Sequence, residues 1–209
     1  MAGMIDTGRQ FDDDTLALLR SCIGRELVEY TAYCPFRERN IYAVARLAFG
    51  SAQVYGNPGT LALDISNRHE SIVLGPESVE EDLAIMRVEA TPADAPELWH
   101  PHGTELATCV LGLKVNDVLV VVDTMLLSKG SRQLNKLVLV QAVAFESVDA
   151  DGKVRIVAFD RDAWSDEYLN VCEGGKISEV TRDMRSDYVA EPPYSYRFGR
   201  NIVRLSNRR

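Results

Sequence analysis

Residues 137–160 read LVLVQAVAFESVDADGKVRIVAFD, and this stretch decides the fold class of the chain. The segment from Leu137 to Phe145 is apolar and rich in β-branched residues, which favours a strand. On the far side, apolar residues recur at every second position from Val154 to Ala158. Asp151-Gly152 lies between the two runs, and an Asp-Gly pair in that position is a strong hairpin signal because glycine tolerates positive φ. The sequence therefore predicts a β-hairpin that turns at these two residues.

Outward from this hairpin, further segments show strand patterns. Val118 to Leu127 is dominated by β-branched and aliphatic residues, and Leu27 to Tyr33 contains several good strand formers. Leu61 to Ile65 alternates apolar with polar residues after Asn57-Pro58-Gly59, a turn in which proline presets φ and glycine accepts a positive φ. Residues 41–55 predict another long strand. We expect six to nine strands in all.

The two halves of the chain share one order of elements: strand, polar basic loop, long strand, glycine turn, strand. This predicts a mainly β protein with an antiparallel barrel-like or two-sheet sandwich core, built from two similar three-stranded meander halves with one to three short helices. The expected division is residues 1–90, with the N-terminal helix and first meander, a proline-rich connector at 91–106, the second meander at 107–175, and a basic aromatic C-terminal segment at 176–209 packed on the body. The two halves could also form a single domain.

Three stretches carry helix signals. Asp12 to Asp14 precede an amphipathic run that ends before Gly24, which predicts a short helix with a favourable N-terminal charge and a glycine stop. Residues 78–81 form a capping box that favours a helix over 78–88, although residues 83–88 also fit a strand. A third short helix is expected over residues 165–171.

Composition places the chain among ordinary globular proteins. Hydrophobic residues make up 46% and charged residues 26% of the sequence, and no apolar run approaches the roughly 20 residues that span a bilayer. The N-terminal residues are polar and acidic, unlike a secretory signal. The four cysteines are widely spaced and form no CxxC pair, which favours free thiols over a disulfide framework or a zinc site. We therefore expect a cytoplasmic protein with no membrane partner.

The residues with the strongest catalytic character are His100, His102 and Glu105. Imidazoles titrate near neutral pH and bind zinc, and the glutamate could complete a ligand set or act as a base. The alternative is a polar surface loop, which the proline between the two histidines favours. A second acidic stretch, Asp160 to Glu167, matches a strand end followed by a helix start better than it matches a cation site. No glycine-rich nucleotide loop or serine-hydrolase motif occurs, and no cofactor is expected.

Aromatic and basic residues alternate near the C-terminus. The formal charge of the whole chain is −8, whereas residues 182–209 hold seven arginines and three acids, a net charge of +4. This pattern fits a protein interface, a nucleic-acid contact or packing against the acidic remainder of the same chain. The candidate partner-binding residues are Tyr194, Tyr196, Arg197, Phe198 and Arg200.

These patterns predict a non-enzymatic binding module or scaffold that recognises a protein partner or a small ligand and associates with itself. One alternative is a metal-assisted hydrolase or acid–base enzyme with its site near His100, His102 and Glu105. A further alternative is nucleic-acid binding through the C-terminal arginines and tyrosines, which the acidic body disfavours.

Overall fold

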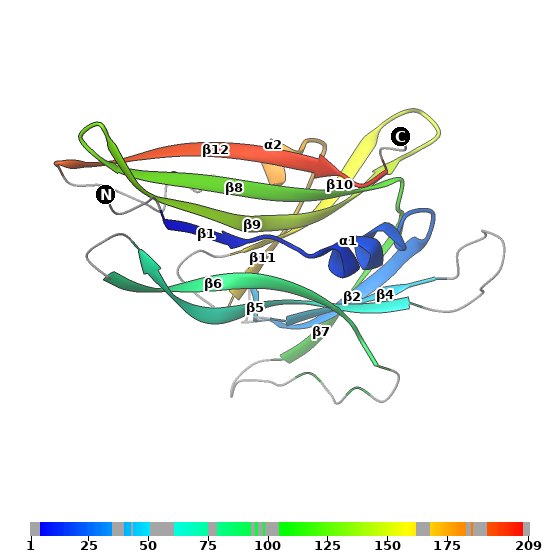
Figure 1. Cartoon of the computed structure of the whole chain (residues 1–209). Helices are drawn as coiled ribbons and strands as arrows, with labels where there is room; N and C mark the ends of the chain where they lie inside the picture. Colours follow the sequence, from blue (N-terminus) through cyan, green and yellow to red (C-terminus); the bar gives the residue numbers. More distant parts are fainter. Residues whose placement is uncertain are drawn as a thin grey trace.

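The computed structural model describes residues 5–34, 40–42, 44–50, 61–74, 79–92, 95, 98, 105–161, 168–182, 185 and 192–206. Twelve strands and two helices occur in these residues (Figure 1). In chain order they are β1 (Ile5–Arg9), α1 (Asp13–Arg20), β2 (Glu26–Cys34), β3 (Asn40–Tyr42), β4 (Val44–Phe49), β5 (Leu61–Leu74), β6 (Val79–Ala90), β7 (Glu105–Lys114), β8 (Asp117–Lys129), β9 (Arg132–Val148), β10 (Val154–Arg161), β11 (Tyr168–Gly174), α2 (Ile177–Val180) and β12 (Tyr194–Arg204).

The larger sheet is organised around β9. Its strands follow the order β12-β8-β9-β10-β11-β3, and all of these neighbours are antiparallel. Strand β1 joins the same sheet by pairing parallel to residues 135–139 of β9, while β10 pairs with residues 142–148. Strand β8 pairs with one edge of β9. Strands β1 and β10 therefore pair with the other edge, β1 along residues 135–139 and β10 along residues 142–148. Gln141 lies at the junction between them.

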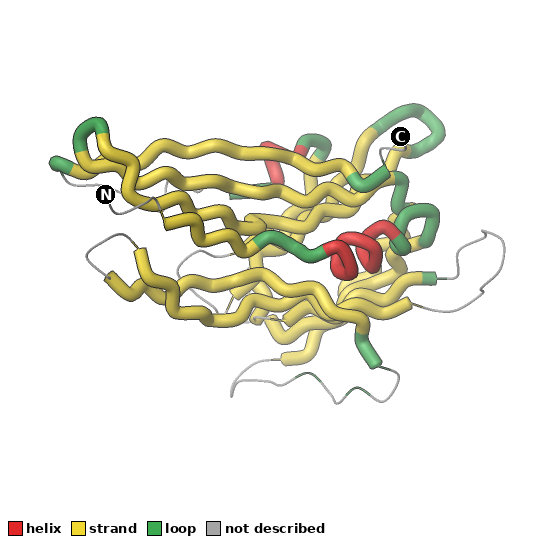
Figure 2. The backbone as a smooth tube through the Cα atoms, viewed as in Figure 1, coloured by secondary structure: helices red, strands yellow, loops and turns green. Residues whose placement is uncertain are grey.

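The second sheet has the order β6-β5-β4-β2-β7, with antiparallel neighbours throughout. The two sheets stack as layers, and α1 lies between them at one end (Figure 2). The predicted mainly β class is confirmed, and of its two forms the structure has the two-sheet sandwich, because the sheets do not close into a barrel. Each half does contain a three-stranded meander, β4-β5-β6 in one and β8-β9-β10 in the other.

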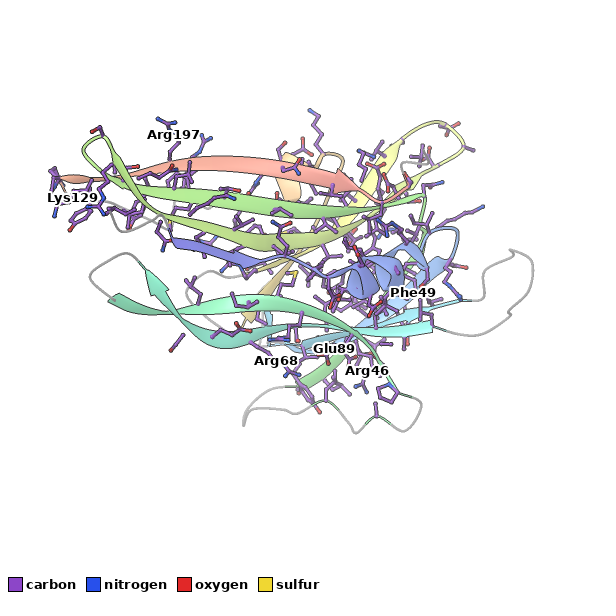
Figure 3. All side chains as sticks on the ribbon, viewed as in Figure 1. Arg46, Phe49, Arg68, Glu89, Lys129 and Arg197 are labelled. Atoms are coloured by element: carbon purple, nitrogen blue, oxygen red, sulfur yellow. The ribbon has the colours of Figure 1, made fainter. Side chains whose placement is uncertain are left out.

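The main core lies between the layers and is aromatic at its centre. Phe145 of β9 contacts Phe49 of β4, with ring centroids 5.6 Å apart, and Phe159 of β10, at 6.2 Å. Tyr30 of β2 meets Phe159 edge-on at 5.6 Å. Phe49 points into this space beside α1 (Figure 3). Leu19 of the helix is fully buried in the same cluster, so the amphipathic pattern of α1 seals one end of the core.

Several local predictions are confirmed. The chain turns at Asp151-Gly152 between β9 and β10, and Gly152 has φ +77°. Asp12 caps α1 by accepting a hydrogen bond from the Thr15 amide at 2.8 Å, and Gly24 beyond the helix has φ +85°. These signals depend on residues close in sequence, which is why the sequence alone revealed them. The predicted turn at Asn57-Pro58-Gly59 lies outside the described residues.

Of the helix and strand alternatives for residues 78–88, the strand is confirmed, and the helix expected over residues 165–171 is wrong in the part that the structure describes. Residues 79–90 form strand β6, which pairs with β5 over twelve residues, and residues 83–86 are buried consecutively. A strand covered on both faces has no alternation to distinguish it from a helix, so tertiary pairing overrides the local capping signal. Residues 168–174 likewise form strand β11 between β10 and β3, not a helix. The strand count of twelve also exceeds the predicted six to nine.

Candidate functional site

The aromatic residues of the C-terminal segment belong to a strand of the larger sheet. Strand β12 pairs with β8 along its whole length. Tyr196 and Phe198 are half-buried and pack on a cluster formed by Leu83, Ile85, Met125, Leu137 and Leu139. Arg197 lies between them in sequence, is exposed, and points away from the sheet (Figure 3). Two candidate partner residues therefore face the protein's own interior.

Arg200 is also engaged within the chain. Its guanidinium donates to both carboxylate oxygens of Asp123 on β8 at 2.7 Å, to Thr181 Oγ1 at 3.2 Å and to the carbonyl oxygen of Arg182. Further along β12, Arg204 binds Asp117 and Glu146. The buried acids of the body thus pair with arginines of the tail, and Lys129 stacks on Tyr194 at 5.1 Å from the ring centroid.

A buried polar network occupies the junction where β10 ends. Arg161 is fully buried and donates from Nη1 to the Ala84 carbonyl of the opposite sheet and from Nη2 to Gln141 Oε1, both at 3.0 Å. Gln141 in turn donates to Asp160 Oδ1 and to the Arg161 carbonyl at 2.9 Å. Burial raises the pKa of Asp160 to about 7, against the opposing effect of hydrogen bonds from Arg182 and Gln141. The hydrogen bond from Arg161 to Ala84 connects the two sheets.

The histidine stretch is only partly described. Glu105 is the exposed first residue of β7, in register with Cys34 of β2. His100 and His102 lie outside the described residues, so the proposed triad stays a prediction. Within the described part of the chain, no group of three or more histidine, cysteine, aspartate and glutamate side chains could hold a metal ion.

Among the described strands, β7 carries the most exposed large apolar side chains. It ends the smaller sheet in the described part of the chain, next to β2. Val110 is 74% exposed and Leu106 is 54% exposed, higher fractions than for the other exposed large hydrophobic residues described. Thr108 lies between them on the same face and shares a hydrogen bond with Thr31 of β2, Oγ1 to Oγ1 at 3.2 Å. An exposed apolar edge strand is a template for pairing with another chain.

The rest of that outer face is covered with ion pairs. Arg46 binds Asp64 at 2.8 Å, Arg87 binds Glu70 at 2.6 Å, and Arg68 approaches Glu89 at 3.8 Å. Arg46, Arg68 and Glu89 lie on the side of the smaller sheet that faces away from the larger one (Figure 3). Among the described side chains of this face, ion pairs occur on β4, β5 and β6, whereas β7 exposes Leu106 and Val110. This contrast locates a candidate interaction surface at β7, defined by Leu106, Thr108 and Val110.

Sequence reasoning missed this surface because it placed no strand over residues 105–114. The signal was present, since Leu106, Thr108 and Val110 alternate with Ala107 and Cys109. Among the described residues, no helix is long and apolar enough to cross a membrane. Comparisons with protein-family models, with curated proteins and with solved structures give no match for this chain.

Proposed function

We propose that this chain is a non-enzymatic, cytoplasmic binding module that forms a homodimer by pairing β7 with β7 of a second copy. The observation that carries this proposal is the exposure of Leu106 and Val110 on a terminal strand of the described sheet. A cytoplasmic location is supported by Cys22 and Cys109, which are free thiols in the described part of the chain.

The pattern on β7 is complementary to itself. In a two-fold antiparallel pair centred on Thr108, Leu106 of one copy faces Val110 of the other, and this apolar contact occurs twice. The two Thr108 side chains face each other at the centre. Each Thr108 already shares a hydrogen bond with Thr31 of its own chain. The pairing would therefore place four threonines in a row across the smaller sheets of the two copies. Opposed aliphatic and threonine pairs both stabilise antiparallel strands.

Other registers fit less well. A pair centred on Val110 would place Leu106 against the Lys114 ammonium and Thr108 against Gly112, which has φ +56°. A pair centred on Cys109 would leave Leu106 opposite Gly112, with no side chain to cover it. The centre at Thr108 is therefore the register that buries the exposed apolar side chains of β7.

Charge also favours the antiparallel arrangement. Strand β7 begins with Glu105 and ends with Lys114, both exposed. Antiparallel pairing brings the acidic end of one strand toward the basic end of the other, whereas parallel pairing would align like charges. Pairing along a single strand buries less surface than the roughly 1,200 Å² that stable complexes bury, so we expect a weak, reversible dimer.

The test is site-directed cross-linking in a Cys109→Ala background, which removes the neighbouring thiol. Thr108→Cys places two thiols opposite each other in the proposed register, within the Cα separation of about 4.4–6.8 Å that a disulfide needs. We expect a disulfide-linked dimer under mild oxidation. Val110→Cys is the matched control: this position is 74% exposed, yet its two copies would lie about four residues apart along the strand and should not cross-link.

A mixture of Leu106→Cys and Val110→Cys chains should form the mixed disulfide that neither variant forms with itself. Sedimentation analysis of the chain with Val110→Lys should show a shift toward monomer, because the substitution places a charge against Leu106 of the other copy. The proposal is wrong if wild-type protein stays monomeric at about millimolar concentration or if Val110→Cys cross-links as fast as Thr108→Cys.

A further inference from the structure

A second surface feature lies at the C-terminal end of β7, beside the hairpin between β9 and β10 and the end of β11. It is a cleft of 530 Å³ formed by the end of β7, the hairpin between β9 and β10, and the end of β11. Arg155 of β10 spans this junction by donating from Nη1 to the Leu111 carbonyl of β7 at 3.0 Å. The cleft is lined by Gly112, Leu113, Ser147, Asp149, Lys153, Val154, Arg155, Glu173, Gly174 and Gly175.

Glycines keep the cleft open. A Cβ at Gly112 or Gly175 would meet no atom closer than 3.7 Å, so the missing side chains leave space rather than relieve a clash. Gly174 differs, because its Cβ would come within 2.8 Å of Val180 and must be absent for α2 to pack. Gly112 at the end of β7 and Gly174-Gly175 at the end of β11 expose backbone to the cleft.

The polar side chains of the cleft retain hydrogen-bonding capacity. Arg155 uses Nε and Nη2 on Glu173 Oε2, at 3.2 and 2.9 Å, and Nη1 on Leu111, which leaves two of its five N–H groups. The Lys153 ammonium has no partner among the described residues, and Glu173 Oε1 accepts no hydrogen bond from them. Asp149 accepts two backbone hydrogen bonds through Oδ1 in the hairpin turn, which leaves Oδ2.

We propose that this cleft binds a small zwitterion of the amino-acid class. Lys153 and the remaining N–H groups of Arg155 would hold the carboxylate, and Glu173 Oε1 with Asp149 Oδ2 would hold the ammonium. The two cations and two anions of the lining cancel, so a ligand with one charge of each sign keeps the site neutral. Val154 provides an aliphatic surface for a side chain, and the lining contains no aromatic ring on which a base or sugar could stack.

The proposal is independent of the dimer, because none of the residues that hold the ligand lies on the exposed face of β7. Its test uses the full chain and three matched probes: L-leucine, 4-methylpentanoate and 3-methylbutylamine. The second lacks the ammonium of leucine and the third lacks its carboxylate, while the aliphatic part is kept. Binding is followed by the amide shifts of Gly112, Gly174 and Gly175 in heteronuclear NMR spectra.

We expect leucine to bind at least about tenfold more tightly than either half-probe, since each lost charge-assisted contact removes a factor of ten or more. Lys153→Met should weaken leucine and 4-methylpentanoate but leave 3-methylbutylamine unchanged. Glu173→Gln should show the reverse selectivity. Lys129→Met, at the far end of the sandwich, is the matched control and should leave all three affinities unchanged (Figure 3).

Both substituted cleft residues are about half-exposed or more, so the variants are expected to fold, and unchanged shifts outside the cleft will verify this. The proposal is overturned if saturating leucine leaves the three glycine amides unmoved. It is also overturned if a half-probe binds as tightly as leucine, or if Lys153→Met weakens the amine and the carboxylate equally.

Discussion

At the residue scale, Asp160 is a carboxyl group whose burial opposes its ionisation. Asp160 is 1% exposed. The backbone N–H of Arg182 donates to its Oδ2 at 3.0 Å, and the side-chain amide of Gln141 donates to its Oδ1. Desolvation nevertheless outweighs these contacts and the nearby charges of Arg161 and Arg200, so the pKa rises from 3.8 to about 7. Ionised Asp160 therefore weakens the fold at neutral pH, while holding the chain after α2 in place.

This predicts a specific pH dependence. A carboxyl whose pKa is raised in the folded state contributes stability that is present below pH 4 and is lost as the pH rises through 7. Asp160→Asn removes that titration. The free energy of unfolding of the variant should therefore rise relative to that of the wild type by up to about 4 kcal/mol as the pH increases from 4 to 8.

Urea denaturation at several pH values measures the difference. Asp151→Asn, in the exposed hairpin turn, is the control and should follow the wild-type curve. A constant difference between Asp160→Asn and the wild type across this pH range would contradict the prediction.

At the scale of elements, the hairpin between β9 and β10 depends on a backbone conformation. Gly152 has φ +77°, and a Cβ there would meet no atom within 4 Å. Gly152→Ala should therefore cost about 1 kcal/mol from backbone strain alone. Gly199 of β12 also has open space around a Cβ but does not have positive φ, so Gly199→Ala should be neutral or slightly stabilising. The urea midpoints of the two variants distinguish backbone strain from steric crowding around the new methyl group. Equal losses of stability in Gly152→Ala and Gly199→Ala would show that the positive φ of Gly152 is not the cause.

Strand β12 is fixed to β8 by charge as well as by backbone pairing. Removing the Arg200 guanidinium leaves Asp123, whose side chain is 4% exposed, without its bidentate partner. Because Arg200 itself is 28% exposed, part of the effect is screened, and Arg200→Met should cost about 2 kcal/mol. Arg197→Met on the outer side of the same strand should cost less than about 0.5 kcal/mol. Thermal or chemical denaturation of both variants gives the comparison, and similar losses would argue against the ion pair.

At the scale of the whole molecule, net charge opposes self-association. Each chain carries a formal charge of −8, so two copies repel at long range, while the apolar contacts at β7 do not depend on salt. Raising sodium chloride from about 20 to about 300 mM should therefore strengthen the proposed dimer several-fold. Sedimentation equilibrium measures the dissociation constant. Association that weakened steeply with salt would instead indicate contacts between opposite charges, as in binding to a polyanion.

The sequence predicted the features that depend on neighbouring residues. Asp151-Gly152 specified a turn, and Asp12 with Leu19 specified a capped, half-buried helix. The apolar residues of β9 and this turn specified a strand that pairs with β10, but they did not specify that β1 shares the same edge of β9. The cleft at Arg155 and the surface at Leu106 both went unpredicted, because each depends on where β7 lies relative to other strands.

By itself, the sequence determined a mainly β chain with a hairpin at Asp151-Gly152 and a short first helix, because these follow from local backbone preferences and from the periodicity of apolar side chains. Only the tertiary structure decided that residues 79–90 form a strand, that β1 and β10 share one edge of β9, and that Arg161 reaches Ala84 across the sandwich. Those outcomes depend on hydrogen bonds and burial between residues far apart in the chain, which a local pattern does not encode.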